Sequence, residues 1–154
     1  MDCESLKWIN IDNMDTSQVT DMGSLFSGCK SLTSIDASHF NTSKAKNIGG
    51  LFSKCEKLTS IDVTNFDTRS VEYIHSLFDN CKNLLSVNIS NFNTSKVVHI
   101  GHMFDQCNAL TSLDLSHFDT SLVTNIDNMF FGCDSLEYLD VSNFNTEKMN
   151  NLNT

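Results

Sequence analysis

The sequence predicts an α/β solenoid of about six stacked units, each made of a short strand, a turn and about ten residues of helix. The first observation is a fixed period, because the six cysteines stand 26 residues apart at Cys3, Cys29, Cys55, Cys81, Cys107 and Cys133. The second is a strand-like alternation in each unit, and the third is a helix-like apolar stripe after it. We therefore expect residues 1–154 to form one solenoid, in which each unit buries its apolar face against its neighbours.

The strand is justified by the unit that begins at Cys107, where Leu113 and Leu115 flank Asp114. This period of two is typical of a strand with one buried face. The same positions are apolar in every unit, and they form two columns: Ile9, Ile35, Ile61, Val87, Leu113, Leu139, and Ile11, Ala37, Val63, Ile89, Leu115, Val141. We expect these strands to form a parallel sheet along one face of the solenoid.

The helix is predicted from Val123, Ile126, Met129 and Phe130, whose spacing of 3, 3 and 1 fits one stripe of a helix. An Asp or Asn followed by Thr precedes the stripe in every unit, and either residue could cap the first turn. The threonines are Thr16, Thr42, Thr68, Thr94, Thr120 and Thr146. A regular threonine ladder also suggests an ice-binding surface, but capping explains it more simply.

The cysteines are expected to be buried free thiols that pack as small hydrophobic groups. Equivalent positions in adjacent coils should lie about 5 Å apart, but their side chains point the same way, which is poor geometry for a disulfide. Zinc is not expected, because close-spaced ligand pairs are missing. His75, His99 and His102 could share one face and hold a transition metal, although exposed polar residues are the simpler interpretation.

Composition excludes several classes of function. The formal charge of −9 opposes binding to nucleic-acid phosphates or to anionic membrane surfaces. The longest apolar runs are too short to cross a membrane. Every Ser, Cys and Asp belongs to a repeat column and no Gly-rich phosphate loop occurs, so we expect neither an enzyme nor a cofactor.

The repeat resembles the BspA-like leucine-rich repeat of bacterial surface proteins. The resemblance is carried by Ser90–Val97 and continues through Phe104, Cys107 and Leu110, and it recurs over nearly the whole chain. It implies a right-handed, leucine-rich-repeat-like α/β solenoid with its parallel sheet on the concave face. It also implies a place at the cell surface or outside the cell, and roles in adhesion. It implies no catalytic residues.

Both ends of the sequence lack a polar capping unit, which solenoids normally need for solubility. We expect either a fragment of a longer array or ends that stack on another copy of the chain, and we favour the fragment. The first residues also lack the basic and apolar regions of a signal peptide.

Function is expected on the concave strand face, where residues between the buried strand positions point outward. The candidate ligand-binding residues are Trp8, Asn10, Asp36, Asp62, Asn88, Asp114, Tyr138 and Asp140. Adjacent aspartates such as Asp114 and Asp140 repel each other, so a cation, a basic partner, or only solvent and nearby hydroxyls should offset that cost.

We interpret the chain as a non-enzymatic interaction or adhesion module that binds a protein or glycan through this face. One alternative is a structural spacer in a surface protein. The other is a self-assembling intracellular repeat module.

Overall fold

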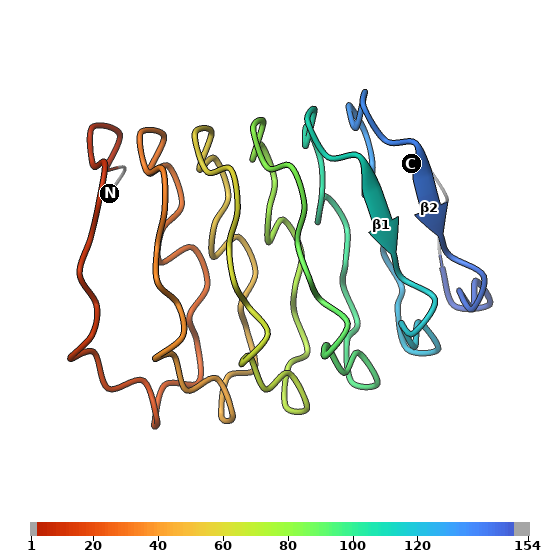
Figure 1. Cartoon of the computed structure of the whole chain (residues 1–154). Helices are drawn as coiled ribbons and strands as arrows, with labels where there is room; N and C mark the ends of the chain where they lie inside the picture. The colour runs from red at the N-terminus through yellow and green to blue at the C-terminus, as the bar shows by residue number, and fades with distance from the viewer. Residues whose placement is uncertain (1–2, 150–154) are drawn as a thin grey trace.

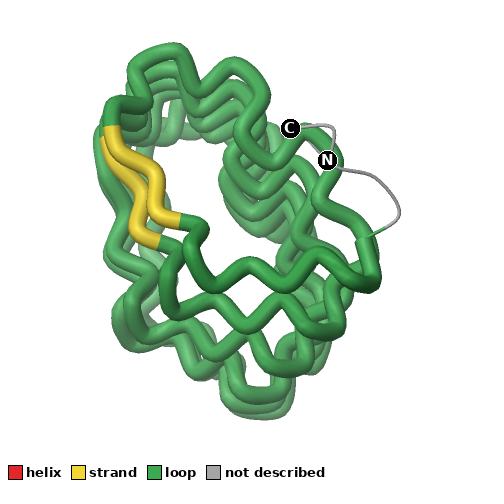
Figure 2. The backbone as a smooth tube through the Cα atoms, turned by 90° about the vertical axis from the view of Figure 1, so that its right-hand side faces the viewer, coloured by secondary structure: helices red, strands yellow, loops and turns green. Residues whose placement is uncertain are grey.

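The fold is a solenoid of stacked coils, seen in a computed structural model that describes residues 3–149. Figure 1 shows the coils side by side in a nearly straight row, and Figure 2, which looks along that row, shows the coils superposed around one common interior. Successive coils repeat every 26 residues, so the predicted repeat solenoid is confirmed in its general architecture. Right-handed winding stays a prediction.

Two short strands lie on one side of the solenoid, β1 (Ser112–Asp114) and β2 (Tyr138–Asp140). They are parallel, and Ser112, Leu113 and Asp114 pair with Tyr138, Leu139 and Asp140. The other predicted strand segments follow the same path but form no further ladder within residues 3–149. We call this surface the strand face and define it as residues 8–12, 34–38, 60–64, 86–90, 112–116 and 138–142.

The predicted helix is wrong: no helix occurs in residues 3–149, and thus no helix there is long and apolar enough to cross a membrane. In place of the predicted helices, segments 21–28, 47–54, 73–80, 99–106 and 125–132 each contain two residues with positive φ, for example Ser76 at 55° and Asn80 at 56°. A right-handed helix does not accommodate such residues. The segment instead forms consecutive tight turns, in which Asp79 N–H bonds to Ser76 C=O and Cys81 N–H to Phe78 C=O.

These turns are joined from coil to coil by a backbone ladder, which we call the turn ladder (residues 21–28, 47–54, 73–80, 99–106 and 125–132). Every second N–H donates to a carbonyl of the following coil: Ile74 to His99, Ser76 to Gly101, Phe78 to Met103 and Asn80 to Asp105, over 2.7–3.3 Å. Isolated parallel bridges run through the same rungs. We expected the main hydrogen bonds between coils to join strands of a parallel sheet. They instead join the consecutive turns of the turn ladder.

The threonine column also differs from the prediction, because it does not cap helices. Thr68 Oγ1 donates to the C=O of Asn93 in the next coil (3.1 Å) and accepts from the Asn93 N–H (2.7 Å). The four other threonines from Thr16 to Thr120 make the same pair of bonds, and all five are 1–3% exposed. An ice-binding role for them is excluded, because side chains this deeply buried cannot contact an ice lattice.

The core consists of stacked columns of equivalent side chains, which are identical in the phenylalanine and cysteine columns. Phe52, Phe78 and Phe104 are fully buried, with ring centroids 6.0 Å and 5.8 Å apart. Cys81 lies beside them and its thiol donates to Phe52 C=O (3.2 Å). All six cysteines are free and Cys29 to Cys107 are buried, as the sequence predicts, whereas Cys133 is half-buried and Cys3 is exposed.

Candidate interaction surface

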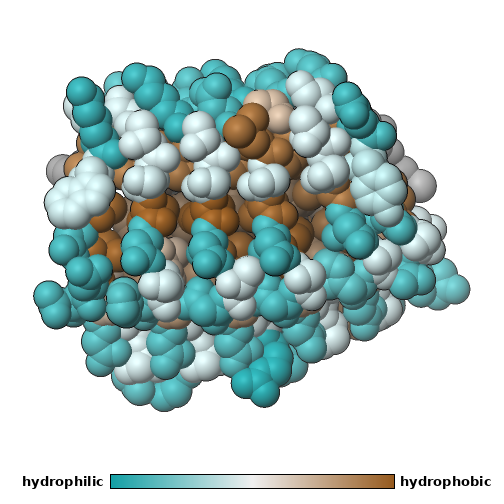
Figure 3. All heavy atoms as spheres, viewed as in Figure 1, coloured by the Kyte–Doolittle hydropathy of each residue, from teal (hydrophilic) through white to brown (hydrophobic). Residues whose placement is uncertain are grey.

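The predicted site residues lie together along the strand face, since they occupy the outward positions between its buried columns. All are exposed except Asp140, which is half-buried. Trp8 and Tyr138 belong to the first and last coils and are 66% and 54% exposed. Figure 3 shows this side of the molecule, where a band of apolar side chains is visible between rows of more polar ones. The face is thus a regular surface with an aromatic side chain in each terminal coil.

The Asp and Asn side chains of the strand face are held in place by short local bonds. In every coil the Oδ1 atom accepts the N–H of the residue two positions later, as Asp62 does from Thr64, over 2.9–3.1 Å. In three coils a hydroxyl bonds to the same oxygen. This is an Asx turn, which explains why the column admits only Asp and Asn.

The same bonds keep the carboxylates charged. Hydrogen bonds from the side chain and then the backbone N–H of the residue two positions later lower the pKa of Asp36, Asp62, Asp114 and Asp140. The negative charge of one aspartate opposes this at its neighbour: Asp36 acts on Asp62, and Asp114 on Asp140. Nearby hydroxyls and amides therefore offset the cost that we expected for adjacent aspartates.

The strand face is acidic without any balancing cation. It contains Asp12, Asp36, Asp62, Asp114 and Asp140 but no Lys or Arg. The ion pairs between described residues all lie elsewhere: Lys30–Glu4, Lys46–Glu72, Arg69–Asp67, Lys82–Glu56 and His102–Asp105. The face therefore concentrates uncompensated negative charge on one side of the solenoid.

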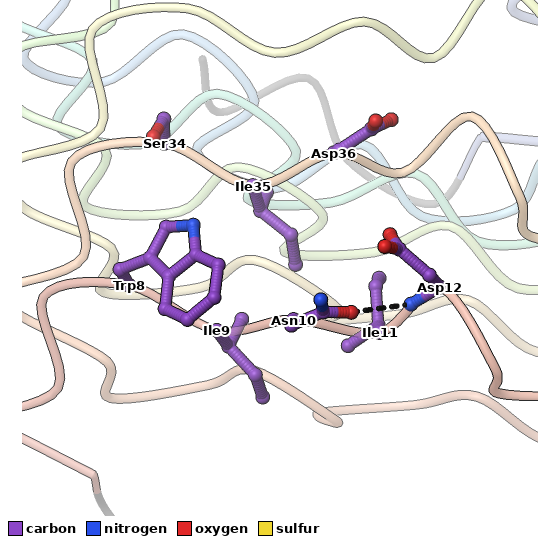
Figure 4. Close-up of a pocket in the computed structure, with 8 residues that line it drawn as sticks. All are labelled: Trp8, Ile9, Asn10, Ile11, Asp12, Ser34, Ile35 and Asp36. Carbon is purple, nitrogen blue, oxygen red and sulfur yellow. Dashed lines mark hydrogen bonds between the residues drawn. The ribbon is translucent and has the colours of Figure 1, made fainter.

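A hollow of about 490 Å³ lies on the strand face between the first and second coils. We call it the Trp8 hollow; it is lined by Trp8, Ile9, Asn10, Ile11, Asp12, Ser34, Ile35 and Asp36. In Figure 4 the Trp8 indole and the Asp12 carboxylate lie on the side of their coil that faces the second coil, and Ile35 points into the space between. The hollow combines an aromatic ring, aliphatic side chains and two carboxylates.

A second hollow, of about 260 Å³, lies three coils further along the same face. Its lining includes Asn88, Leu113, Asp114 and His117. The His117 ring nitrogen Nε2 is already engaged with the Ile89 carbonyl, 3.0 Å away. Both hollows open between adjacent coils, so the strand face has depressions as well as projecting side chains.

Asp12 and Ser34 are not among the candidate ligand-binding residues predicted from the sequence, although both stand in outward columns beside them. The signal for Asp12 was present, because it is the only carboxylate in a column that is otherwise Ser or Thr: Ser38, Thr64, Ser90, Ser116 and Ser142. The hollow itself had no signal in the sequence, since it depends on the separation of the first two coils.

The histidines do not form the conceivable metal site. The His75 ring stacks on His99 with centroids 4.8 Å apart, while His102 Nδ1 lies 2.8 Å from Asp105. Burial lowers the pKa of His75, and the nearby His99 and His102 act in the same direction. Within residues 3–149, no group of three or more His, Cys, Asp or Glu side chains is arranged to hold a metal ion.

Stacked 26-residue coils with strands on one face define the chain as a leucine-rich-repeat solenoid. Its structure is similar to that of a leucine-rich repeat protein from Bacteroides ovatus, with 27% identity, a TM-score of 0.53, and coverage of 78% of this chain and 28% of that one. A leucine-rich repeat protein from Eubacterium ventriosum, at 23% identity and a TM-score of 0.50, shares the fold over 79% of this chain and 29% of the Eubacterium protein.

The chain belongs to the family described as "Mycoplasma protein of unknown function, DUF285", whose model matches residues 1–112 and 56–154. Together with the two solved structures, this match confirms the resemblance to BspA-like leucine-rich repeats. The chain spans less than a third of the length of those two proteins. No curated protein matches it.

Proposed function

We propose that the chain is a non-enzymatic interaction module that binds a partner protein through its strand face. The observation that carries the proposal is the arrangement of that face: exposed, rigidly held polar groups at each coil, with two hollows and two exposed aromatic side chains. Exposed aromatic residues are typical anchors of protein interfaces. The resemblance to bacterial surface repeats supports a role in adhesion at the cell surface.

Rigidity is the physical advantage of this surface. Each Asp or Asn of the column is fixed by its Asx turn, and each coil is fixed to the next by the turn ladder and the buried threonines. This chain should therefore lose little conformational entropy when it binds a partner. Affinity would come from many modest contacts repeated from coil to coil, with Trp8 and Tyr138 as anchors.

The experiment is a binding screen against extracellular-matrix proteins and glycans with a sterically blocked variant, Ser60→Trp/Ser86→Trp. Both serines are exposed in the centre of the strand face, in the column where Trp8 and Tyr138 show that an aromatic side chain fits. The control is Ser43→Trp/Ser95→Trp, two exposed positions shortly before the turn-ladder segments of their coils, where Arg69 stands in the coil between.

We expect a protein ligand that the blocked variant loses and the control retains, with both variants folded by circular dichroism. Equal binding by both variants would contradict the strand face as the site. A glycan as the only ligand would contradict a protein partner, and a screen with no ligand at all would favour the structural spacer.

A further inference from the structure

We propose that the Trp8 hollow binds a lysine or arginine side chain of the partner, and that the strand face selects extended, positively charged polypeptide segments. This inference rests on the proposed function and specifies the chemistry of its partner. The hollow carries it, because it brings together the three kinds of surface that such a side chain contacts: an aromatic face, an aliphatic wall and a carboxylate.

The aromatic and aliphatic parts suit the stem of a cationic side chain. Trp8 is 66% exposed and lies against the space between the two coils, so its ring face is accessible (Figure 4). Ile9 and Ile35 line the same space. Lysine and arginine cover apolar surface with their methylene groups while the charged head stays in water, and indole is the best side-chain partner for a cation.

The carboxylates suit the charged head. Asp36 uses Oδ1 to accept the Ser38 N–H at 2.9 Å, and Asp12 lines the hollow from the facing coil. His39 can carry positive charge, and it acts electrostatically on Asp36. No lysine or arginine of the described residues forms an ion pair with either aspartate. A partner's cation would therefore not have to displace one of these side chains from Asp12 or Asp36.

The rest of the face extends the same preference along the solenoid. Asp62, Asp114 and Asp140 follow Asp36 in one column, and the last two pair directly in register on β1 and β2. Adjacent coils of a parallel arrangement lie about 4.8 Å apart. An extended segment laid across the coils would therefore meet a carboxylate at most coils and a hollow at two places.

The experiment uses the single tryptophan of the chain as its reporter, because Trp8 is the only one present. Three peptides of equal length serve as probes: a Gly-Lys repeat, a Gly-Ser repeat and a Gly-Glu repeat. We expect only the Gly-Lys peptide to shift the Trp8 emission in a saturable way, and we expect added salt to weaken that binding because exposed charges are screened.

The test variant is Asp12→Ser/Asp36→Asn, which puts at each position a residue that other coils already carry there, such as Ser38 and Asn88. We expect it to weaken Gly-Lys binding about five- to tenfold, the combined effect of two exposed ion pairs. The control is Asp15→Asn/Asp119→Asn, which removes the same charge from positions before the turn-ladder segments, where Asn41 and Asn93 stand in equivalent positions.

Three results would overturn this inference: no response of Trp8 to the Gly-Lys peptide, an equal response to the Gly-Ser peptide, or equal weakening by the control. The proposed function is tested separately by the blocked variant. If that variant loses a protein ligand while the Gly-Lys peptide does not bind, the strand face stands as the site and only its preference for cations is wrong.

Discussion

Replacing Thr68 with valine tests whether the buried threonines hold adjacent coils together. Valine keeps the branched shape of threonine and exchanges the hydroxyl for a methyl group. Thr68 is 2% exposed, and its hydroxyl makes two bonds to Asn93, one to the C=O at 3.1 Å and one from the N–H at 2.7 Å. The substitution therefore removes both bonds and leaves two backbone groups without that partner.

A hydrogen bond of this kind contributes about 1 kcal/mol, so we expect Thr68→Val to lower the free energy of unfolding by about 2 kcal/mol. Thr124→Val is the matched control. Its hydroxyl is exposed and makes one long bond, to the Val98 C=O at 3.3 Å. We expect that change to cost about 0.5 kcal/mol or less.

The assay is equilibrium unfolding in urea, followed by far-ultraviolet circular dichroism, with the slope of the transition compared among all three proteins. Equal slopes would show that the same amount of structure unfolds in each. A loss below about 0.5 kcal/mol for Thr68→Val, or equal losses for both variants, would refute the view that these threonines join the coils.

Three further outcomes follow from the core and the turn ladder. Phe78→Ala should lower the free energy of unfolding by about 3–5 kcal/mol in the same urea assay, because it leaves a void between two stacked rings. A loss near 1 kcal/mol would mean that the column collapses around the gap. Iodoacetamide labelling of the native protein, read by mass spectrometry, should modify Cys3 rapidly and Cys81 very slowly, because burial raises the pKa of the Cys81 thiol; rapid labelling of Cys81 would show that coils open readily. The lowered pKa of His75 means that the unfolded chain binds its proton more tightly, so stability should fall as pH drops below about 6.5. His75→Asn should reduce that fall relative to His39→Asn, and an unchanged pH profile would contradict the role of His75.

The repeat architecture and the core could be predicted from the sequence because both depend on period alone. The phenylalanine column from Phe26 to Phe104 and the cysteine column from Cys29 to Cys107 are buried as expected. Any fold that stacks 26-residue units must place equivalent side chains above one another. The strand-face residues could be placed for the same reason. Their outward direction follows from the alternation around Leu113 and needs no knowledge of the rest of the coil.

The helix was wrong because its apolar spacing has two structural solutions. Ile74, Leu77, Phe78 and Cys81 stand at i, i+3, i+4 and i+7, which fits a helix, yet consecutive turns bury the same four side chains. What distinguishes the two is the positive φ at Ser76 and Asn80, and no glycine marks those positions in this coil. The hydrogen bonds of the turn ladder form only between coils, and they favour the turns over a helix. The sequence signal was the glycine at three of the ten equivalent positions with positive φ, Gly28, Gly50 and Gly132.

The turn ladder also gives the solenoid an electrical direction. Its peptide N–H groups point toward the following coil and its accepting carbonyls toward the preceding one, four times at each junction from the first coil to the fifth. Aligned peptide dipoles add, as they do along an α-helix. The turn ladder should therefore contribute an axial field, positive toward the later coils and negative toward the first. A smaller number of backbone N–H groups, such as those of Glu72 and Val98, donate to the preceding coil and reduce this field. Adding whole repeats would lengthen that dipole, so a solenoid of this family could tune its long-range attraction for a charged partner through the number of its coils.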